Sequence, residues 1–453
     1  MKLLSSNELK MLHENRVANL DRKQIMPAHI EQLMIDLSVR NDIESRLVGH
    51  SFSGLPISCF SIGTGPIKVL MWSQMHGDES TATAAVLDIL HLLSSEDTKP
   101  LLNDRLDTNW QNLITLHIVP MLNPDGAQAA TRENAQCIDI NRDALALQTP
   151  EGKILDSLVT ELCPDYAFNL HDQHDYYRCG VDGKSSTLAF LAPAFDVDKT
   201  VNLSRRKAMA LIALMKSQSN SLLPKGIARY DDEFSARSFG DQIAKREVST
   251  ILIESGHYPD DANREVARTM NVCVLIHALN MLCNQDNWNT DEKLEALEEK
   301  YWQIPENQEY KLCDILIKNV GFAEGSYTAD IAIRKNSRFK NAFVVAEIGD
   351  LHEQFGLRTI DASGYIYNSG RPYLLDEKLQ LNEESYFSLL KQGFSHFVGD
   401  PVLLANQTDY VTIDNPKFWH DDQRMLLGIV PAGFLSKDGK LKYAIIESDV
   451  IPL

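Results

Sequence analysis

Hydrophobic positions follow two different patterns along the chain, and the pattern changes near residue 285. Up to that point, short apolar runs rich in Leu, Ile and Val alternate with longer segments in which apolar residues recur every three to four positions. The short runs predict strands, and the longer segments predict amphipathic helices. The predicted strands are 56–63, 67–74, 113–122, 166–171 and 248–255, and the predicted helices are 5–16, 80–95, 151–163, 204–223 and 264–283.

This alternation predicts an α/β domain over residues 1–285, with a central sheet covered by helices on both faces. Residues 286–310 are polar and charged, and they predict a linker that contains a connecting helix. In residues 311–453 the pattern changes to short alternating runs separated by Gly, Asn and Asp, which predicts a smaller β-rich accessory domain. A chain of 453 residues is long enough for these two domains.

Composition narrows the class of protein. With 44% hydrophobic and 24% charged residues, the chain has the composition of a folded globular protein. Its formal net charge of −19 argues against nucleic acid or an anionic membrane as a partner, because both require basic patches. The charge leaves the oligomeric state open.

Cysteine usage and the apolar pattern predict a cytoplasmic protein. The seven cysteines are odd in number and scattered, and no C-x-x-C pair occurs. The first residues, MKLLSSNELKMLHENR, lack the continuous apolar segment of a signal peptide. Since no uninterrupted apolar stretch of about 18 residues occurs either, we expect no transmembrane segment.

Polar side chains follow several predicted strands at the point where each strand ends. His76 and Glu79, in MWSQMHGDES, follow one strand, His171 ends another, and Glu254 lies at the end of a third. The turn sequence NPDG (123–126) follows a fourth. In open α/β sheets, ligands bind at the carboxyl ends of the strands. We therefore expect these residues to build one site.

The residue types at these strand ends suit a catalytic metal ion. Two histidines and one glutamate are a frequent ligand set for catalytic zinc, and His76, Glu79 and His171 supply it. Glu254 could accept the proton of an attacking water, and Arg132 could stabilise a developing oxyanion. Each residue also has an ordinary structural interpretation, as a polar turn, a core histidine or a surface ion pair.

The sequence leaves two assignments open, the second histidine ligand and the role of Asn141 and Arg142. His174 lies three residues after His171 and could replace it as a ligand, although the strand-end position favours His171. Asn141 and Arg142 supply an amide and a guanidinium side by side, which suits a substrate with a free carboxylate. The same pair could instead be a turn followed by a surface arginine.

Six motifs in one order give the chain a family resemblance over about residues 45–285. They are HGDE (76–79), NPDG (123–126), R-x-N (132–134), D-x-N-R (139–142), NLHD (169–172) and IES (253–255). In order, spacing and strand context this set resembles the zinc carboxypeptidases of the carboxypeptidase A type. The resemblance implies a mixed, largely parallel α/β sheet, one Zn²⁺ ion, and the hydrolysis of C-terminal peptide bonds.

The resemblance also implies a role for each matching position. The zinc ligands would be His76, Glu79 and His171, and Asp139 would orient a ligand histidine. Glu254 would be the general base and acid, and Arg132 would polarise the scissile carbonyl. The terminal carboxylate of the substrate would be held by Asn141 and Arg142. The family usually places a mobile tyrosine about 20 residues before the catalytic glutamate. Tyr230 lies near that distance, but its surroundings do not match well enough for an assignment.

Two other functions compete with a carboxypeptidase. Zinc-dependent deacylases of the aspartoacylase and succinylglutamate desuccinylase kind share part of the motif set and act on N-acyl amino acids, although NPDG and the R-x-N spacing favour a peptidase. A catalytically silent scaffold would lack part of the water-activating machinery, whereas every expected position is filled here. Residues 311–453 faintly resemble the composite β-domain of amidohydrolases, and we assign no catalysis to them.

Overall fold

The computed structural model describes residues 6–453 except 22, 96, 323–324, 337–341 and 416–426. The chain divides into two compact units, Met1–Glu309 and Tyr310–Leu453. The segment that the polar pattern assigns to a linker therefore lies almost entirely in the first unit.

Helix α10 explains this difference, because it has an apolar side despite its charged sequence. It spans Asp291–Trp302 and packs against α7 (Leu203–Ser219). Leu294, Leu297 and Tyr301 are buried in this contact region. Three apolar positions at helical spacing are enough to fix a helix whose other faces are solvated.

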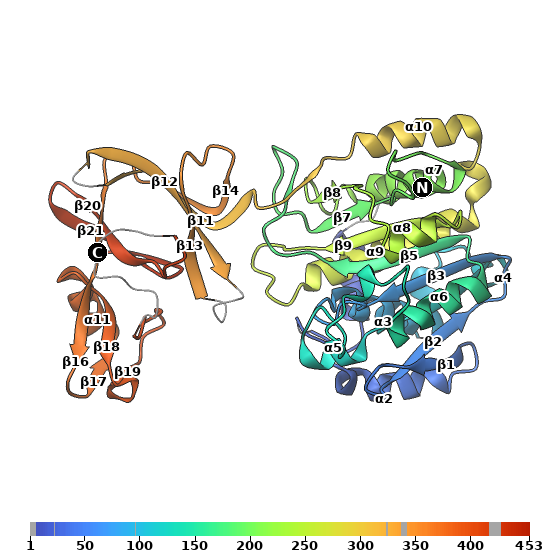
Figure 1. The fold of residues 1–453 in the computed structure, drawn as a ribbon, viewed down its shortest axis with the longest axis horizontal. Coiled ribbons are helices and arrows are strands. Elements are labelled where there is room, and N and C mark those ends of the chain that lie inside the picture. The colour runs from blue at the N-terminus through green and yellow to red at the C-terminus, as the bar shows by residue number, and fades with distance from the viewer. Residues whose placement is uncertain (1–5, 22, 96, 323–324, 337–341, 416–426) are drawn as a thin grey trace. The chain divides into compact units, whose positions relative to one another are not determined.

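An eight-stranded mixed sheet forms the centre of the first unit (Figure 1). Its strand order is β1 (Glu44–His50), β2 (Pro56–Ile62), β4 (Ile114–Val119), β3 (Ile67–Ser73), β5 (Tyr166–Asp172), β9 (Ser249–Ser255), β7 (Leu188–Leu191) and β8 (Ile227–Arg229). The central strands β4, β3, β5 and β9 are parallel, whereas β1, β2 and β7 each have an antiparallel neighbour. The predicted mixed, largely parallel sheet is confirmed.

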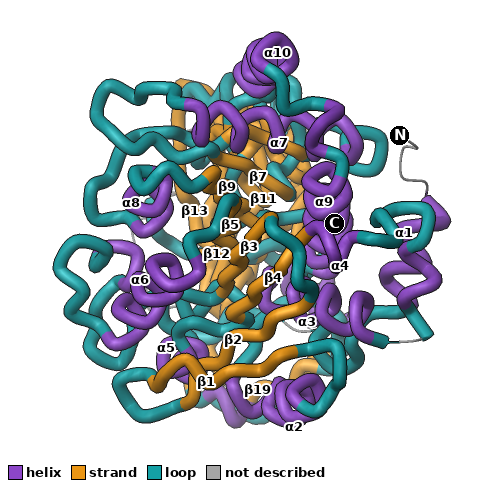
Figure 2. The backbone as a smooth tube through the Cα atoms, turned by 90° about the vertical axis from the view of Figure 1, so that its right-hand side faces the viewer, coloured by secondary structure: helices purple, strands orange, loops and turns teal. Residues whose placement is uncertain are grey.

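Helices cover both faces of this sheet (Figure 2). The other helices of the unit are α1 (Ser6–Glu14), α2 (Pro27–Ser38), α3 (Thr81–Ser94), α4 (Trp110–Leu113), α5 (Pro124–Ala129), α6 (Pro150–Leu162), α8 (Phe239–Ala244) and α9 (Glu265–Cys283), with 3₁₀ turns η1 (Lys99–Leu102), η2 (Ile140–Arg142) and η3 (Gln285–Asn287). Helices α3, α7 and α9 contribute to the larger core on one face, and α6 and α8 contribute to a smaller core on the other. Two short strands, β6 (Arg178–Cys179) and β10 (Asn307–Gln308), pair outside the main sheet.

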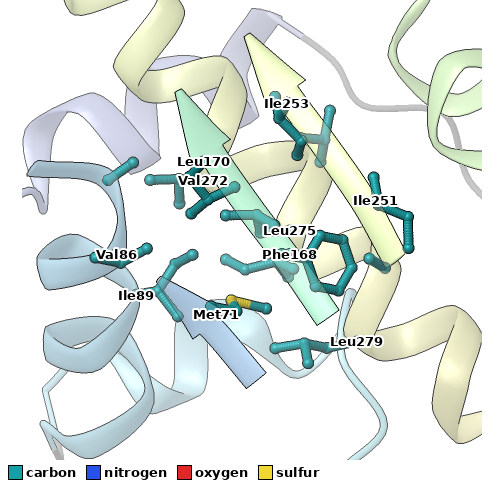
Figure 3. Packing of buried hydrophobic residues seen from close by; sticks show 14 of the residues in the cluster. Met71, Val86, Ile89, Phe168, Leu170, Ile251, Ile253, Val272, Leu275 and Leu279 are labelled. Carbon is teal, nitrogen blue, oxygen red and sulfur yellow. The ribbon is translucent and has the colours of Figure 1, made fainter. Parts of the chain in front are cut away.

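The alternation of side chains along the central strands decides which residues face which core. Phe168, Leu170, Ile251 and Ile253 point into the larger core, where they meet α3 and α9 (Figure 3). Residues at the intervening positions of the same strands point to the opposite face, because strand side chains alternate. His171 has that parity, so it projects on the side of α6 and α8.

Helix α9 is the one helix among the described residues that is long and apolar enough to cross a membrane by length and composition. In the first unit, however, 83% of its apolar window is buried. Val272, Leu275 and Leu279 pack against the sheet in Figure 3. These are the contacts of a core helix.

The second unit is β-rich, as predicted. Its main sheet has the order β13 (Ala342–Gly349), β12 (Tyr327–Asn336), β11 (Leu312–Phe322), β15 (Ile366–Ser369), β20 (Ala432–Lys437), β21 (Lys440–Ile446) and β22 (Asp449–Pro452), with β14 (Phe355–Asp361) also pairing with β11. Smaller pairs and turns are β16 (Arg371–Leu375) with β18 (Phe394–Gly399), β17 (Leu379–Leu381) with β19 (Leu404–Asn406), helix α11 (Glu383–Lys391) and η6 (Pro401–Leu403).

Candidate active site

Three potential metal ligands meet at the carboxyl edge of the sheet in the first unit. His76 and Glu79 lie in the loop between β3 and α3, and His171 is the sixth residue of β5. The Nδ1 atoms of His76 and His171 are 3.2 Å apart, and they lie 2.8 and 2.7 Å from the two carboxylate oxygens of Glu79. Both rings are 2% exposed, so the cluster is buried.

This donor set fits a zinc ion. Zinc bonds of about 2.1 Å at tetrahedral angles separate neighbouring ligand atoms by about 3.4 Å. One potential ligand atom from each of the three residues lies within 4.8 Å of the others. The two Nδ1 atoms are 3.2 Å apart, which is close to the separation of two ligand atoms on one such ion.

Asp139 and Arg132 hold the cluster from one side. Asp139 Oδ1 lies 3.1 Å from His76 Nε2, so the carboxylate can accept the proton of the ring nitrogen that faces away from Glu79. Arg132 donates through Nε to Asp139 Oδ2 at 3.0 Å and through Nη1 to Glu79 Oε1 at 3.1 Å. The guanidinium predicted to polarise a substrate carbonyl therefore lies beside the potential ligands.

The charges in this cluster shift the pKa values of its members. Burial favours the neutral form of His76, but Glu79 and Asp139 outweigh burial and raise the pKa of His76 to about 9. Burial would also raise the pKa of Glu79, but the two imidazoles hold it well below its usual range. The cluster therefore holds an ionised carboxylate between two rings, which favours binding of a cation.

Glycines allow the loop that carries His76 and Glu79 to approach α5 closely. A Cβ atom at Gly77 would lie only 1.9 Å from the carbonyl carbon of Gly126, so a larger residue at position 77 would displace the loop. The NPDG sequence is the beginning of α5, where the Asn123 side chain accepts from Gly126 N at 2.9 Å. NPDG thus supports the metal-ligand loop without contributing a ligand to the cluster.

Glu254 lies beside His171 in the sheet. The two residues are register partners across the parallel strands β5 and β9. The Oε2 atom of Glu254 is buried and has no hydrogen-bond partner among the described residues. Burial, followed by the charge of Glu79, raises the pKa of Glu254 well above its usual value, although His76 opposes the shift.

Asn141 and Arg142 follow Asp139 in the turn η2. Asp139 Oδ1 accepts from Asn141 N at 2.8 Å, which links the turn to the carboxylate that contacts His76. The buried Asn141 side chain accepts from Phe239 N at 2.9 Å and from Ser238 Oγ at 3.2 Å. Arg142 is exposed, and its Nη1 donates to Asn141 O at 2.8 Å.

His174 lies outside the cluster of potential ligands. Its Nε2 lies 3.1 Å from Glu309 Oε1, and its ring packs against Tyr177 in a tilted arrangement with centroids 4.4 Å apart. The Tyr177 hydroxyl lies 3.1 Å from the hydroxyl of Tyr230. Burial and the charge of Glu254 both raise the pKa of Tyr230, so the two side chains interact electrostatically.

The sequence assigns no role to two charged residues near the cluster, Asp172 and Arg264. Asp172 follows His171 directly in NLHD, and its backbone N donates to Glu79 Oε2 at 3.2 Å. Arg264 lies immediately before α9 and is 5% exposed. Asp172 could have been noted as a charge next to a potential ligand, but no motif marks Arg264, because it contacts backbone carbonyls of distant segments.

A buried His-Glu-His cluster at the carboxyl edge of an α/β sheet, with a carboxylate and a guanidinium beside it, is typical of a metal-dependent hydrolase. Residues 30–156 match the model of the zinc carboxypeptidase family. This match confirms the resemblance of the first unit to the carboxypeptidase A-like zinc peptidases, and it supports a metallopeptidase.

Individual relatives are similar over limited parts of the chain. Carboxypeptidase SOL1 of Arabidopsis thaliana is 30% identical over 122 residues, which are 25% of this chain and 24% of that protein. The chain thus matches about a quarter of the length of this curated relative. A metallo-carboxypeptidase of Burkholderia cenocepacia has a TM-score of 0.46 and 16% identity, covering 57% of this chain and 70% of its own. Carboxypeptidase A of Helicoverpa armigera has a TM-score of 0.47 and 15% identity, covering 62% and 80%.

Proposed function

We propose that the first unit is a zinc-dependent carboxypeptidase that hydrolyses C-terminal peptide bonds. The observation that carries this proposal is the buried cluster of His76, Glu79 and His171, with Glu254 as the register partner of His171. One zinc ion bound by the three ligands would supply Lewis acidity and lower the pKa of a bound water. The family match supports this choice of metal and reaction.

Glu254 would move the proton in this reaction. Its buried, unpartnered Oε2 can accept a proton from the attacking water and later donate it to the leaving amine. A carboxyl group with a raised pKa retains the proton long enough to transfer it. Register pairing with His171 keeps Glu254 at the edge where the potential metal ligands lie.

Arg132 and the η2 turn would bind the substrate. Arg132 lies 3.1 Å from Glu79, so its guanidinium is close enough to stabilise negative charge that develops on the scissile carbonyl oxygen. Asn141 and Arg142 would hold the free terminal carboxylate, since an amide and a guanidinium both donate to carboxylate oxygens. A free carboxylate next to the scissile bond defines a carboxypeptidase substrate.

A substrate panel tests this proposal. The zinc-loaded protein should hydrolyse peptides with a free C-terminus faster than the same peptides with a C-terminal amide. Glu254→Gln should lower kcat by roughly 10²- to 10⁴-fold, because it removes the proton acceptor and changes the side-chain shape little. Glu299→Gln, an exposed change on α10, is the matched control and should leave kcat unchanged.

Two results would contradict the proposal in different ways. Equal activity of the wild type and Glu254→Gln on every substrate would remove the role of Glu254. Activity on N-acyl amino acids but on no peptide would identify the site as a deacylase, the competing function that shares several of the same motifs.

A further inference from the structure

The guanidinium of Arg264 lies buried behind the catalytic edge of the first unit. Its Nη1 donates to Ser255 O at 2.8 Å, and its Nη2 donates to Gln173 O and to Asp175 Oδ1, both at 2.7 Å. These acceptors belong to two segments that lie far apart in the sequence. One buried cation therefore joins the end of β5 to the end of β9.

The two carbonyls lie at the ends of the strands that carry the proposed catalytic groups. Ser255 is the last residue of β9 and follows Glu254, and Gln173 comes directly after β5, two positions past His171. Gln173 N also donates to Ser255 O at 2.9 Å. The planar guanidinium of Arg264 thus adds hydrogen bonds from a third segment at the point where the parallel pair β5–β9 ends.

Asp172 extends the network to the third potential ligand. Its Oδ2 lies 3.7 Å from Arg264 Nη1 and accepts from Thr81 Oγ1 at 2.7 Å and from Thr81 N at 3.1 Å. Its backbone N donates to Glu79 Oε2 at 3.2 Å. Arg264, Asp172 and the start of α3 therefore connect the loop of Glu79 to the end of β5.

The backbone of Arg264 is strained, and the side-chain contacts offset that strain. Its φ of 59° and ψ of 32° lie in the left-handed region, which is unfavourable for a residue with a Cβ. A lysine in the same position would keep the charge but could not donate to two diverging carbonyls and a carboxylate with a rigid fork. The geometry thus depends on the guanidinium itself as well as on its charge.

We propose that Arg264 is a positioning residue that sets the placement of His171 and Glu254 relative to each other. It touches neither substrate nor the reacting atoms and acts through the strand ends. Its kinetic consequence rests on the proposed peptidase function, whereas its consequence for metal binding does not. Losing the fork lets the ends of β5 and β9 move apart and weakens both the metal site and proton transfer.

Arg264→Lys tests the proposal, with Arg268→Lys as its matched control. Arg268 lies one turn further along α9, is 2% exposed, and donates to both oxygens of Asp88 at 2.8 Å and to Val17 O at 2.9 Å, all away from the strand ends. Zinc affinity is measured by chelator competition, together with kcat, KM and the thermal midpoint. Arg264→Lys should weaken zinc binding and lower kcat by roughly 10- to 100-fold with little change in KM.

The control should separate positioning from general stability. Arg268→Lys should lower the thermal midpoint at least as much while leaving zinc affinity and kcat unchanged. Unchanged zinc affinity and kcat in Arg264→Lys would overturn the proposal, and so would equal losses in both variants. If the wild type binds zinc but hydrolyses no substrate, the peptidase function fails and zinc affinity alone decides the role of Arg264.

A milder variant keeps the test decisive if Arg264→Lys does not fold. Asp175→Asn preserves the shape of one Arg264 partner but removes its charge. Asp175→Asn should also weaken zinc binding, by a smaller factor than Arg264→Lys. Unchanged zinc affinity in Asp175→Asn would then overturn the proposal.

Discussion

The His76 and His171 rings share the carboxylate of Glu79, but a second carboxylate beside His76 makes the pKa values of the two rings move in opposite directions. His76 has a second carboxylate, Asp139, and its pKa is raised to about 9. His171 has only Glu79 to oppose its complete burial, and its pKa is lowered. Both Nδ1 atoms lie within hydrogen-bond distance of Glu79, at 2.8 and 2.7 Å. A divalent cation bound by Glu79 would use both nitrogens as further ligands.

Substitution of Arg142 tests how the proposed site recognises the free carboxylate of its substrate. Arg142→Ala should raise KM by roughly 10- to 100-fold for peptides with a free C-terminus, because a hydrogen bond to a charged group contributes about 1.5–3 kcal/mol. For C-terminally amidated peptides KM should change little. The measurement is the ratio of the two KM values in wild type and variant.

The control for this prediction is Arg237→Ala. Arg237 is exposed, and its backbone carbonyl accepts from Ala144 N at 3.1 Å, so it lies close to the same turn. It should leave both KM values unchanged. An unchanged KM ratio in Arg142→Ala would remove the carboxylate-binding role from this residue.

Strand polarity brings the candidate site residues together, and that is why much of the site could be predicted at the scale of elements. Parallel strands end at the same edge of a sheet, so polar residues at the ends of β3, β5 and β9 had to converge once the segments were recognised as strands. The register that pairs His171 with Glu254 could not be predicted, because it depends on how β5 and β9 slide relative to each other. Arg264 could not be predicted either, because it contacts backbone carbonyls of segments that are distant in the sequence.

Truncation of Leu275 tests the packing of α9, which contributes side chains to the larger core against the sheet (Figure 3). Leu275 is fully buried among strand and helix side chains. Leu275→Ala should lower the free energy of unfolding of the first unit by about 2–5 kcal/mol, from lost burial and the cavity left behind. Chemical denaturation followed by circular dichroism measures the change.

Leu203→Ala is the matched control for the core prediction. Leu203 begins α7 and is 55% exposed, so its truncation removes little buried surface. It should change the free energy of unfolding by less than about 0.5 kcal/mol. Equal losses for Leu203→Ala and Leu275→Ala would contradict the described packing of α9.

At the scale of the molecule, the hydrophobic pattern predicted the α/β and β-rich regions and a helix in the polar segment between them, but it did not indicate that this helix packs as part of the first unit. Helix α10 belongs to the first unit because Leu294, Leu297 and Tyr301 give it a buried side, which net polarity conceals. The family match covers residues 30–156, so it includes His76 and Glu79 but ends before His171 and Glu254. For that second half of the site, strand position and structure carry the proposal.

A buried histidine makes the second unit sensitive to acid. His396 on β18 is 1% exposed, and burial lowers its pKa to about 4. The unfolded chain then binds a proton near pH 6.5 while the folded chain does not, so stability is retained above pH 6.5 and is lost as the pH falls towards 4. The loss should reach about 2 kcal/mol by pH 4, because each tenfold difference in proton affinity between the folded and unfolded chains corresponds to about 1.4 kcal/mol and solvent screening reduces the full effect.

Calorimetry from pH 7 to pH 4 measures this effect. His396→Gln should flatten the pH dependence of unfolding of the second unit, because glutamine does not titrate. His352→Gln, at a side chain that is 74% exposed, should leave the pH dependence as it is in the wild type. A wild-type stability that does not fall between pH 6.5 and pH 4 would contradict the burial of His396.

Zinc stoichiometry tests the proposed metal centre most directly, because the proposed function depends on three potential ligands that come from one loop and one separate strand. Wild-type protein should bind one zinc ion per chain, as measured by elemental analysis after equilibrium dialysis. His171→Ala should lose that ion, whereas His174→Ala should retain it, because His174 is paired with Glu309 outside the cluster. Full zinc occupancy in His171→Ala, or loss of zinc in His174→Ala alone, would contradict the proposed metal centre.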